Sequence, residues 1–257
     1  MIRIADVRKR FGALQVLRGV DLALAPGRVT AIVGPNAAGK STLIKCILGL
    51  AAPDTGTVTF ADGRDVRDPA ARAAIGCMPQ AARFPENLTG HEVLAMLDAL
   101  RPDACPDGTL LDRFGLASQL DKPVRTLSGG TRQKLSAVVA FRYRPSLLVL
   151  DEPTAGLDPL AASIFKAAVL AARDAGASVL LTSHVVSELE TMADDIAFLL
   201  DGTILFAGPV ATLVAGTGAR SLEEALASLM RAPADAIPDA ALRAPGTARL
   251  RVMGDCA

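Results

Sequence analysis

The chain has 257 residues, 51% of them hydrophobic, and this composition favours a large folded domain over a disordered chain. Lys and Arg together number 27, as do Asp and Glu, so the formal net charge is zero. Trp is absent and Tyr143 is the single tyrosine. Nucleic-acid binders usually carry a basic excess and aromatic side chains on which bases stack, so we expect no nucleic-acid partner.

Cysteine and histidine usage excludes the common zinc-site patterns. The four cysteines form no CxxC pair, and there are only two histidines. The N-terminus lacks the apolar segment of a signal peptide, and no apolar run approaches the ~18 residues of a membrane helix. We therefore expect a cytoplasmic chain with reduced thiols, which reaches the inner face of the cell membrane only through a partner.

The first third of the chain predicts a β layer followed by one strand–loop–helix unit. Alternating or β-rich runs indicate strands at 2–7, 28–33, 57–60 and 74–78. A Gly-containing loop follows the second of these runs and leads into a helix expected at 41–50.

The middle of the chain is typical of a helical insert. Helical spacing occurs at 92–100, 109–114 and 131–143, with prolines between the segments. We expect a helical subdomain over about 81–145, inserted into a domain that spans 1–215.

The last part returns to the α/β pattern. Apolar runs at 146–150 and 178–182 indicate buried parallel strands, and 161–175 indicates a helix between them. A hairpin is expected at 196–200 and 203–206, then a short extension over 216–257 with an amphipathic helix at 221–230 and a loosely attached Ala- and Pro-rich tail. The predicted fold class is α/β, a P-loop NTPase with an antiparallel β subdomain and the helical insert.

The segment 34–41 reads GPNAAGKS and fits the P-loop pattern G-x-x-x-x-G-K-[ST]. It follows a predicted strand and opens a predicted helix, which is the context that the motif requires. Backbone N–H groups of such a loop face phosphates, Lys40 neutralises β- and γ-phosphate oxygens, and Ser41 ligates Mg²⁺. The nucleotide-binding residues predicted here are Gly34, Pro35, Asn36, Ala37, Ala38, Gly39, Lys40, Ser41 and Thr42.

Two carboxylates end the apolar run LLVLDE at 147–152. Asp151 is placed to hold Mg²⁺ through water, and Glu152 to orient and deprotonate the attacking water. Solvated acids at a strand end are the alternative, but the preceding P-loop favours the catalytic interpretation.

The segment 127–133, LSGGTRQ, resembles the signature motif of ABC (ATP-binding cassette) transporter ATPases. It lies between the P-loop and the acidic strand end, and the resemblance covers about 1–215. Ser128 is the expected helix N-cap, and Gly129 and Gly130 allow close backbone approach to a phosphate. In this family the motif reaches the γ-phosphate bound to the other subunit.

Four further elements resemble family elements in the expected order. Phe11 resembles the aromatic residue that stacks on adenine, with a core aromatic as the alternative. Gln80 resembles the Q-loop glutamine that contacts Mg²⁺ and takes part in catalysis. The run AGLD at 155–158 resembles the D-loop, and His184 resembles the switch histidine that contacts the γ-phosphate.

The resemblance implies an ATPase that uses ATP and Mg²⁺, pairs with a second copy of itself and docks on a separate integral-membrane permease. The LSGGTRQK string, the SLEEAL segment and the short C-terminus resemble export-type cassettes. Among export-type cassettes, the string SGGTRQK resembles the corresponding string in the ATPase of the system that matures the copper sites of nitrous oxide reductase.

Two departures from the family pattern stand out. Ala37 replaces a usual glycine, so this position must accept a negative φ or nucleotide affinity falls somewhat. Thr131 replaces a usual glutamine, which leaves the contacts at that point open. The alternatives to a transporter subunit are a soluble ABC ATPase acting on nucleic acid or ribosomes and a regulatory nucleotide-binding module without turnover.

Overall fold

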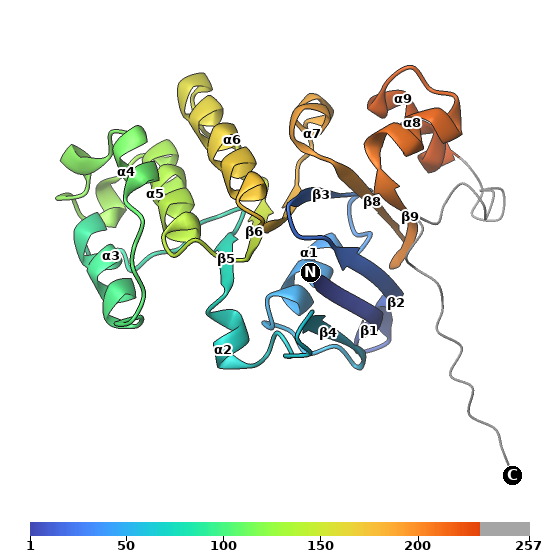
Figure 1. The fold of residues 1–257 in the computed structure, drawn as a ribbon, viewed down its shortest axis with the longest axis horizontal. Coiled ribbons are helices and arrows are strands. Elements are labelled where there is room, and N and C mark those ends of the chain that lie inside the picture. The colour runs from blue at the N-terminus through green and yellow to red at the C-terminus, as the bar shows by residue number, and fades with distance from the viewer. Residues whose placement is uncertain (232–257) are drawn as a thin grey trace, which may run out of the picture.

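The computed structural model describes residues 1–231, which form two sheets with helices packed between and around them (Figure 1). Within these residues the larger sheet has the order β5-β6-β7-β3-β8-β9. Neighbouring strands are parallel except β8 and β9. The strands are β3 (Arg28–Val33), β5 (Ile75–Met78), β6 (Leu147–Asp151), β7 (Ser178–Thr182), β8 (Asp195–Leu200) and β9 (Thr203–Pro209).

A smaller antiparallel sheet has the order β2-β1-β4. Its strands are β1 (Ile2–Phe11), β2 (Leu14–Leu24) and β4 (Thr55–Phe60). Strand β2 was not predicted from the sequence. The buried positions Leu17 and Val20 are three residues apart because Gly19 adopts a φ of 106° between them, which interrupts the period-two pattern of a strand.

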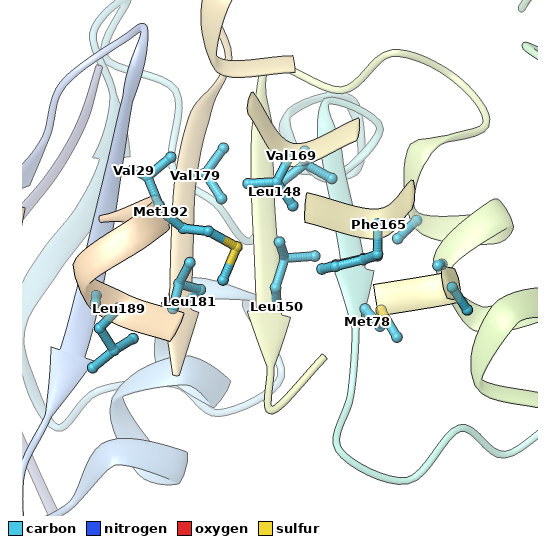
Figure 2. Close-up of a cluster of buried hydrophobic side chains, with 14 of the residues drawn as sticks. Val29, Met78, Leu148, Leu150, Phe165, Val169, Val179, Leu181, Leu189 and Met192 are labelled. Atoms are coloured by element: carbon cyan, nitrogen blue, oxygen red, sulfur yellow. The ribbon is translucent and has the colours of Figure 1, made fainter. Parts of the chain in front are cut away.

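The larger sheet buries both of its faces. Along β6, Leu147 and Val149 pack on one side, while Leu148 and Leu150 pack on the other. Helix α1 (Lys40–Ile47) lies between the two sheets on the first side. Figure 2 shows the second side, where helices α6 (Pro159–Asp174) and α7 (Val186–Met192) cover the strands with Phe165, Val169, Leu189 and Met192.

The helical insert lies beyond the β5 edge of the larger sheet (Figure 1). It contains α3 (Gly90–Ala99), α4 (Thr109–Arg113) and α5 (Gly129–Phe141), and the short α2 (Pro69–Arg72) precedes it. Asp98 of α3 accepts hydrogen bonds from Arg142 at 2.8 Å and from the Tyr143 hydroxyl at 2.7 Å. These bonds fasten α3 to the end of α5, which itself packs against β5.

Two helices follow the hairpin, α8 (Val210–Thr217) and α9 (Leu222–Arg231). The predicted amphipathic helix at 221–230 forms α9, and its apolar face is buried in the same core as α7. Helices α7 and α8 were not predicted. The expected tail lies outside the described residues, and the boundaries 1–215, 81–145 and 216–257 stay predictions. No helix within 1–231 is long and apolar enough to cross a lipid bilayer.

Candidate nucleotide-hydrolysis site

The strand order brings the predicted site together at one edge of the sheet. Carboxyl ends of adjacent parallel strands lie side by side, and β6, β7 and β3 are neighbours. Asp151 and Glu152 end or follow β6, His184 follows β7, and the P-loop follows β3. Gln80 follows β5, next to β6, and its side chain is exposed.

The P-loop needs glycine where the chain passes other backbone. A β-carbon on Gly34 would lie 2.0 Å from the carbonyl oxygen of Leu199, and Gly39 adopts a φ of 107° immediately before α1. The Lys40 ammonium donates hydrogen bonds to the carbonyl oxygens of Gly34 at 2.7 Å and Pro35 at 2.9 Å. Lys40 therefore closes the loop on itself, with Ser41 and Thr42 in the first turn of α1.

Lys40 lies within electrostatic reach of both acids that follow β6. Burial lowers the pKa of the Lys40 ammonium below its usual value, and the charges of Glu152 and Asp151 oppose that change. The net direction is downward, so desolvation outweighs the carboxylates.

Ala37 does not have the negative φ that was one of the two expectations for this position. Its φ is 65°, in the left-handed region, so the position does not take a negative φ. An L-residue with a β-carbon there costs about 1–2 kcal/mol relative to the right-handed region. Because Ala37 is exposed, its methyl group is not crowded by the core, and the unfavourable backbone conformation is the main energetic cost at this position.

Thr182, which no sequence motif marks as a site residue, holds the two acids in place. Its hydroxyl donates to Asp151 Oδ1 at 2.5 Å, while the Glu152 N–H lies 3.1 Å from Thr182 Oγ1 and 3.2 Å from the Thr182 carbonyl oxygen. Glu152 itself adopts a φ of 48°. A non-glycine residue in this region is strained, and such strain persists where surrounding contacts fix the backbone.

Glu152 and His184 are in direct contact. Glu152 Oε1 lies 2.9 Å from His184 Nε2, with side chains 22% and 60% exposed, respectively. The predicted base and the predicted switch histidine thus meet at a partly open position between the ends of β6 and β7. A carboxylate and an imidazole here can hold a water and exchange a proton.

Phe11 lies at the end of β1 in the smaller sheet, and its side chain is 54% exposed. The alternative of a core aromatic is therefore wrong. The Lys9 ammonium lies 5.5 Å from the centre of the Phe11 ring, which leaves the ring as an exposed platform with a cation at one side.

The segment Ser128–Gly130 forms the start of α5 as expected. Ser128 is the N-cap and accepts a hydrogen bond from the Thr131 N–H at 3.1 Å. The Thr131 and Ser128 hydroxyls are 2.8 Å apart, so Thr131 reinforces the cap. Gly129 faces open space, whereas a β-carbon on Gly130 would lie 3.0 Å from the Gly156 carbonyl oxygen.

Two side chains further along α5 fasten it to the segment after β6. The buried Gln133 donates to the Pro153 carbonyl oxygen at 3.2 Å, and Lys134 pairs with Asp158 at 2.8 Å. Within the described part of the chain, no hydrogen bond or ion pair joins Ser128–Gly130 to the P-loop. The structure therefore assembles the strand-end residues but leaves the signature segment apart from them.

Comparison with known proteins decides the family. The model of the ABC transporter family matches residues 17–155. This chain belongs to the ABC transporter family. It is similar to Nod factor export ATP-binding protein I of Azorhizobium caulinodans, with 36% identity over 87% of this chain and 72% of that protein. It is also similar to a daunorubicin resistance ATP-binding protein of Streptomyces coeruleorubidus, with 35% identity over 88% of this chain and 73% of that protein.

Solved structures agree with the fold. The structure of an ATP-binding subunit of an ABC transporter superposes with a TM-score of 0.82 and 29% identity, covering 90% of this chain and all of that one. The chain is thus the ATP-binding subunit of an ABC transporter and an ABC-type ATPase. The predicted fold class, including the antiparallel β subdomain and the helical insert, is confirmed.

Proposed function

We propose that two copies of this chain bind two ATP molecules between them, and that hydrolysis drives a separate export-type permease in the membrane. One observation carries the proposal. The strand ends gather Lys40, Asp151, Glu152 and His184, while the signature segment starts a helix beyond the β5 edge. The strand-end residues form one half of a phosphate-binding site in each chain, and the signature segment forms the other half, which is available to a second copy.

The P-loop binds the phosphates in this proposal. Its backbone N–H groups and the start of α1 favour an anion, and Lys40 exchanges the carbonyl oxygens of Gly34 and Pro35 for phosphate oxygens. The exchange replaces two neutral acceptors by charged ones, which form stronger hydrogen bonds with an ammonium group. Phe11, exposed at the end of β1, stacks on the adenine.

The donor set fits Mg²⁺. Asp151, Ser41 and Gln80 offer carboxylate, hydroxyl and amide oxygens, which are hard ligands, and Mg²⁺ typically takes one or two carboxylates together with nucleotide phosphates. Asp151 keeps its orientation through the Thr182 hydroxyl. Bound there, the ion neutralises negative charge on the phosphate oxygens.

Glu152 is the proposed general base. The water oxygen attacks the γ-phosphorus, the bond to the β-phosphate oxygen breaks, and the water proton passes to the Glu152 carboxylate. His184, 2.9 Å from that carboxylate, holds it in place before the nucleotide arrives and then contacts the γ-phosphate. Glu152 directly follows the last residue of β6, and its φ of 48° is the kind of strained conformation that occurs at functional sites.

A two-fold axis completes the cage. Each P-loop meets Ser128, Gly129 and Gly130 of the other copy, which places a second helix N-terminus at each γ-phosphate. Because ADP lacks the γ-phosphate that joins the two copies, hydrolysis opens the pair. That opening is the mechanical step passed to the permease.

The helical insert is the proposed docking surface for the permease. Met96 and Leu100 are exposed large hydrophobic residues on and directly after α3. Large exposed apolar side chains that gather on one surface mark interaction sites. The relatives carry names of export and resistance ATP-binding proteins, and these names support an export-type partner.

The test compares two exposed methionines as crosslinking positions in cells. A photo-crosslinker at Met96 should capture an integral-membrane protein, while one at Met230 of α9 serves as the control. The captured permease should raise the specific ATPase activity of this chain by at least about fivefold, because docking raises the population of paired chains. Capture of the membrane protein at Met230 alone would contradict the helical insert as the docking surface. No capture at either position, or equal activity with and without the permease, would support the soluble ATPase instead.

The cargo is a finer hypothesis. The SGGTRQK string, residues 128–134, supports a role in maturing the copper sites of nitrous oxide reductase. Deletion of the gene should then lower the copper content of that reductase without changing its abundance. Unchanged copper content would overturn this hypothesis and leave the ATPase proposal intact.

A further inference from the structure

Glu188 of α7 joins two separate segments through a single carboxylate oxygen. The Thr154 hydroxyl donates to Glu188 Oε2 at 2.6 Å, and the Ser183 hydroxyl donates to the same oxygen at 3.2 Å. These contacts bridge 34 and 5 residues of sequence, respectively. An ionised carboxylate oxygen accepts two hydroxyl donors readily, and such bonds are stronger than those between neutral groups.

The two donors flank the Glu152–His184 contact. Thr154 follows Glu152 by two residues, and Ser183 immediately precedes His184. Ser183 Oγ also accepts a hydrogen bond from the Val185 N–H at 3.0 Å, so the backbone on both sides of His184 is tied to one hydroxyl. Glu188 thereby sets the spacing between the segment of the base and the segment of the histidine.

Glu188 is itself held firmly. Its side chain is 15% exposed, and Oε1 lies 3.6 Å from the Lys166 ammonium of α6. On the same helix, Leu189 and Met192 are buried in the core that covers the larger sheet (Figure 2). The carboxylate is therefore anchored by packing on one side and by charge on another.

We propose that Glu188 is a positioning residue for ATP hydrolysis, which fixes Glu152 and His184 relative to each other. The inference rests on the roles proposed above for these two residues. Within residues 1–231 no hydrogen bond or ion pair joins the Glu188 side chain to the P-loop, so its loss should affect the catalytic step rather than ATP binding. A displacement of a reacting group by about 1 Å lowers turnover by up to about a hundredfold.

The experiment measures kcat and KM for ATP with the permease-bound protein. Glu188→Ala should lower kcat at least about tenfold and leave KM within about threefold. Glu188→Gln should retain kcat within about threefold, because its amide oxygen still accepts both hydroxyls. The matched control is Glu190→Ala, which removes the other carboxylate of α7. Glu190 accepts a hydrogen bond from the Leu222 N–H at 3.1 Å, and this variant should leave kcat within about twofold.

Three results would overturn the inference: a folded Glu188→Ala with kcat within about twofold of the parent, a loss confined to KM, or equal losses in Glu188→Ala and Glu188→Gln. If Glu188→Ala does not fold, Thr154→Val and Ser183→Ala remove the two donors separately. A lowered kcat in these variants supports the inference, and unchanged turnover in both contradicts it.

Glu152→Gln and His184→Ala separate this inference from the proposed site. If both keep the parent turnover, the site assignment is wrong and this inference fails with it. If both lose turnover while Glu188→Ala does not, the site assignment stands and the positioning role alone is wrong.

Discussion

The strand edge of the larger sheet and the start of α5 are built in different ways. At the strand edge, Lys40, Asp151 and Glu152 each have a side-chain or backbone partner within the chain, and all are partly buried. At the start of α5, Ser128 and Gly129 are exposed, and the space around Gly129 is open.

This difference indicates where each half of the site finds its partners. Residues that act on the phosphates from within the chain are already oriented, so their removal should damage binding or chemistry directly. Gly129 has open space around it in the single chain, so a change there should leave the single chain intact and damage only the paired state.

The largest effect is expected at the strand edge, for Lys40→Ala. The variant removes the one lysine that closes the P-loop, and with it the charge that binds the β- and γ-phosphates, so ATP affinity should fall at least about a hundredfold. Calorimetric titration with ATP measures this. The control is Lys45→Ala in the last turn of the same helix, which should bind ATP as the parent does. Parent-like affinity in Lys40→Ala would show that the P-loop assignment is wrong.

An intermediate effect is expected at the start of α5, for Gly129→Ala. The added methyl group has no neighbour within 4 Å in the single chain, and alanine favours a helix over glycine, so stability should be equal or slightly higher. Turnover should nevertheless fall at least about tenfold, because the methyl group stands where the phosphate of the other copy is bound.

Gly108→Ala is the matched control, since a methyl group there also meets open space at a helix start. Thermal unfolding and ATPase assays on both variants decide the point. If Gly129→Ala and Gly108→Ala show the same turnover, the signature segment has no role in trans.

The smallest effect concerns Ala37→Gly within the P-loop. Glycine removes the left-handed strain of about 1–2 kcal/mol, while its greater freedom in the unfolded chain costs about 0.5–1 kcal/mol. The net gain of about 0–1.5 kcal/mol should raise Tm by up to about 6 °C. Ala38→Gly is the contrast, because Ala38 is buried and has no positive φ, and its Tm should fall. A lower Tm in both variants would contradict the left-handed conformation at position 37.

The sequence predicted those features that depend on neighbouring residues. The strand at 28–33 and the strand at 178–182 match β3 and β7 to the residue, because runs rich in apolar and β-branched residues and bounded by turns indicate strands. Ser128 was predicted as a helix N-cap and is one, since capping requires only a hydroxyl and the next turn of backbone.

Features that depend on distant residues could not be predicted in this way. The pairing of β6 with β7 is a matter of sheet topology, and its register places Thr182 opposite Asp151. The position of Glu188 against Thr154 depends on how α7 packs over the sheet, and α7 itself lacks a side-chain cap that would mark its start. Residue preference favours a negative φ at Ala37, and the positive φ of 65° that the structure shows there leaves the alternative of a reduced nucleotide affinity as a prediction.

The central claim is that two copies close around ATP, and Glu152→Gln tests it most directly. Glutamine keeps the shape of the glutamate but takes no proton from water, so bound ATP persists and holds the copies together. Size-exclusion chromatography with light scattering, in saturating ATP and Mg²⁺, should give twice the chain mass of 26.5 kDa for this variant. When ADP replaces ATP, the same measurement should give the mass of one chain. A Glu152→Gln protein that remains at the single mass with ATP, even at high protein concentration, would contradict the claim.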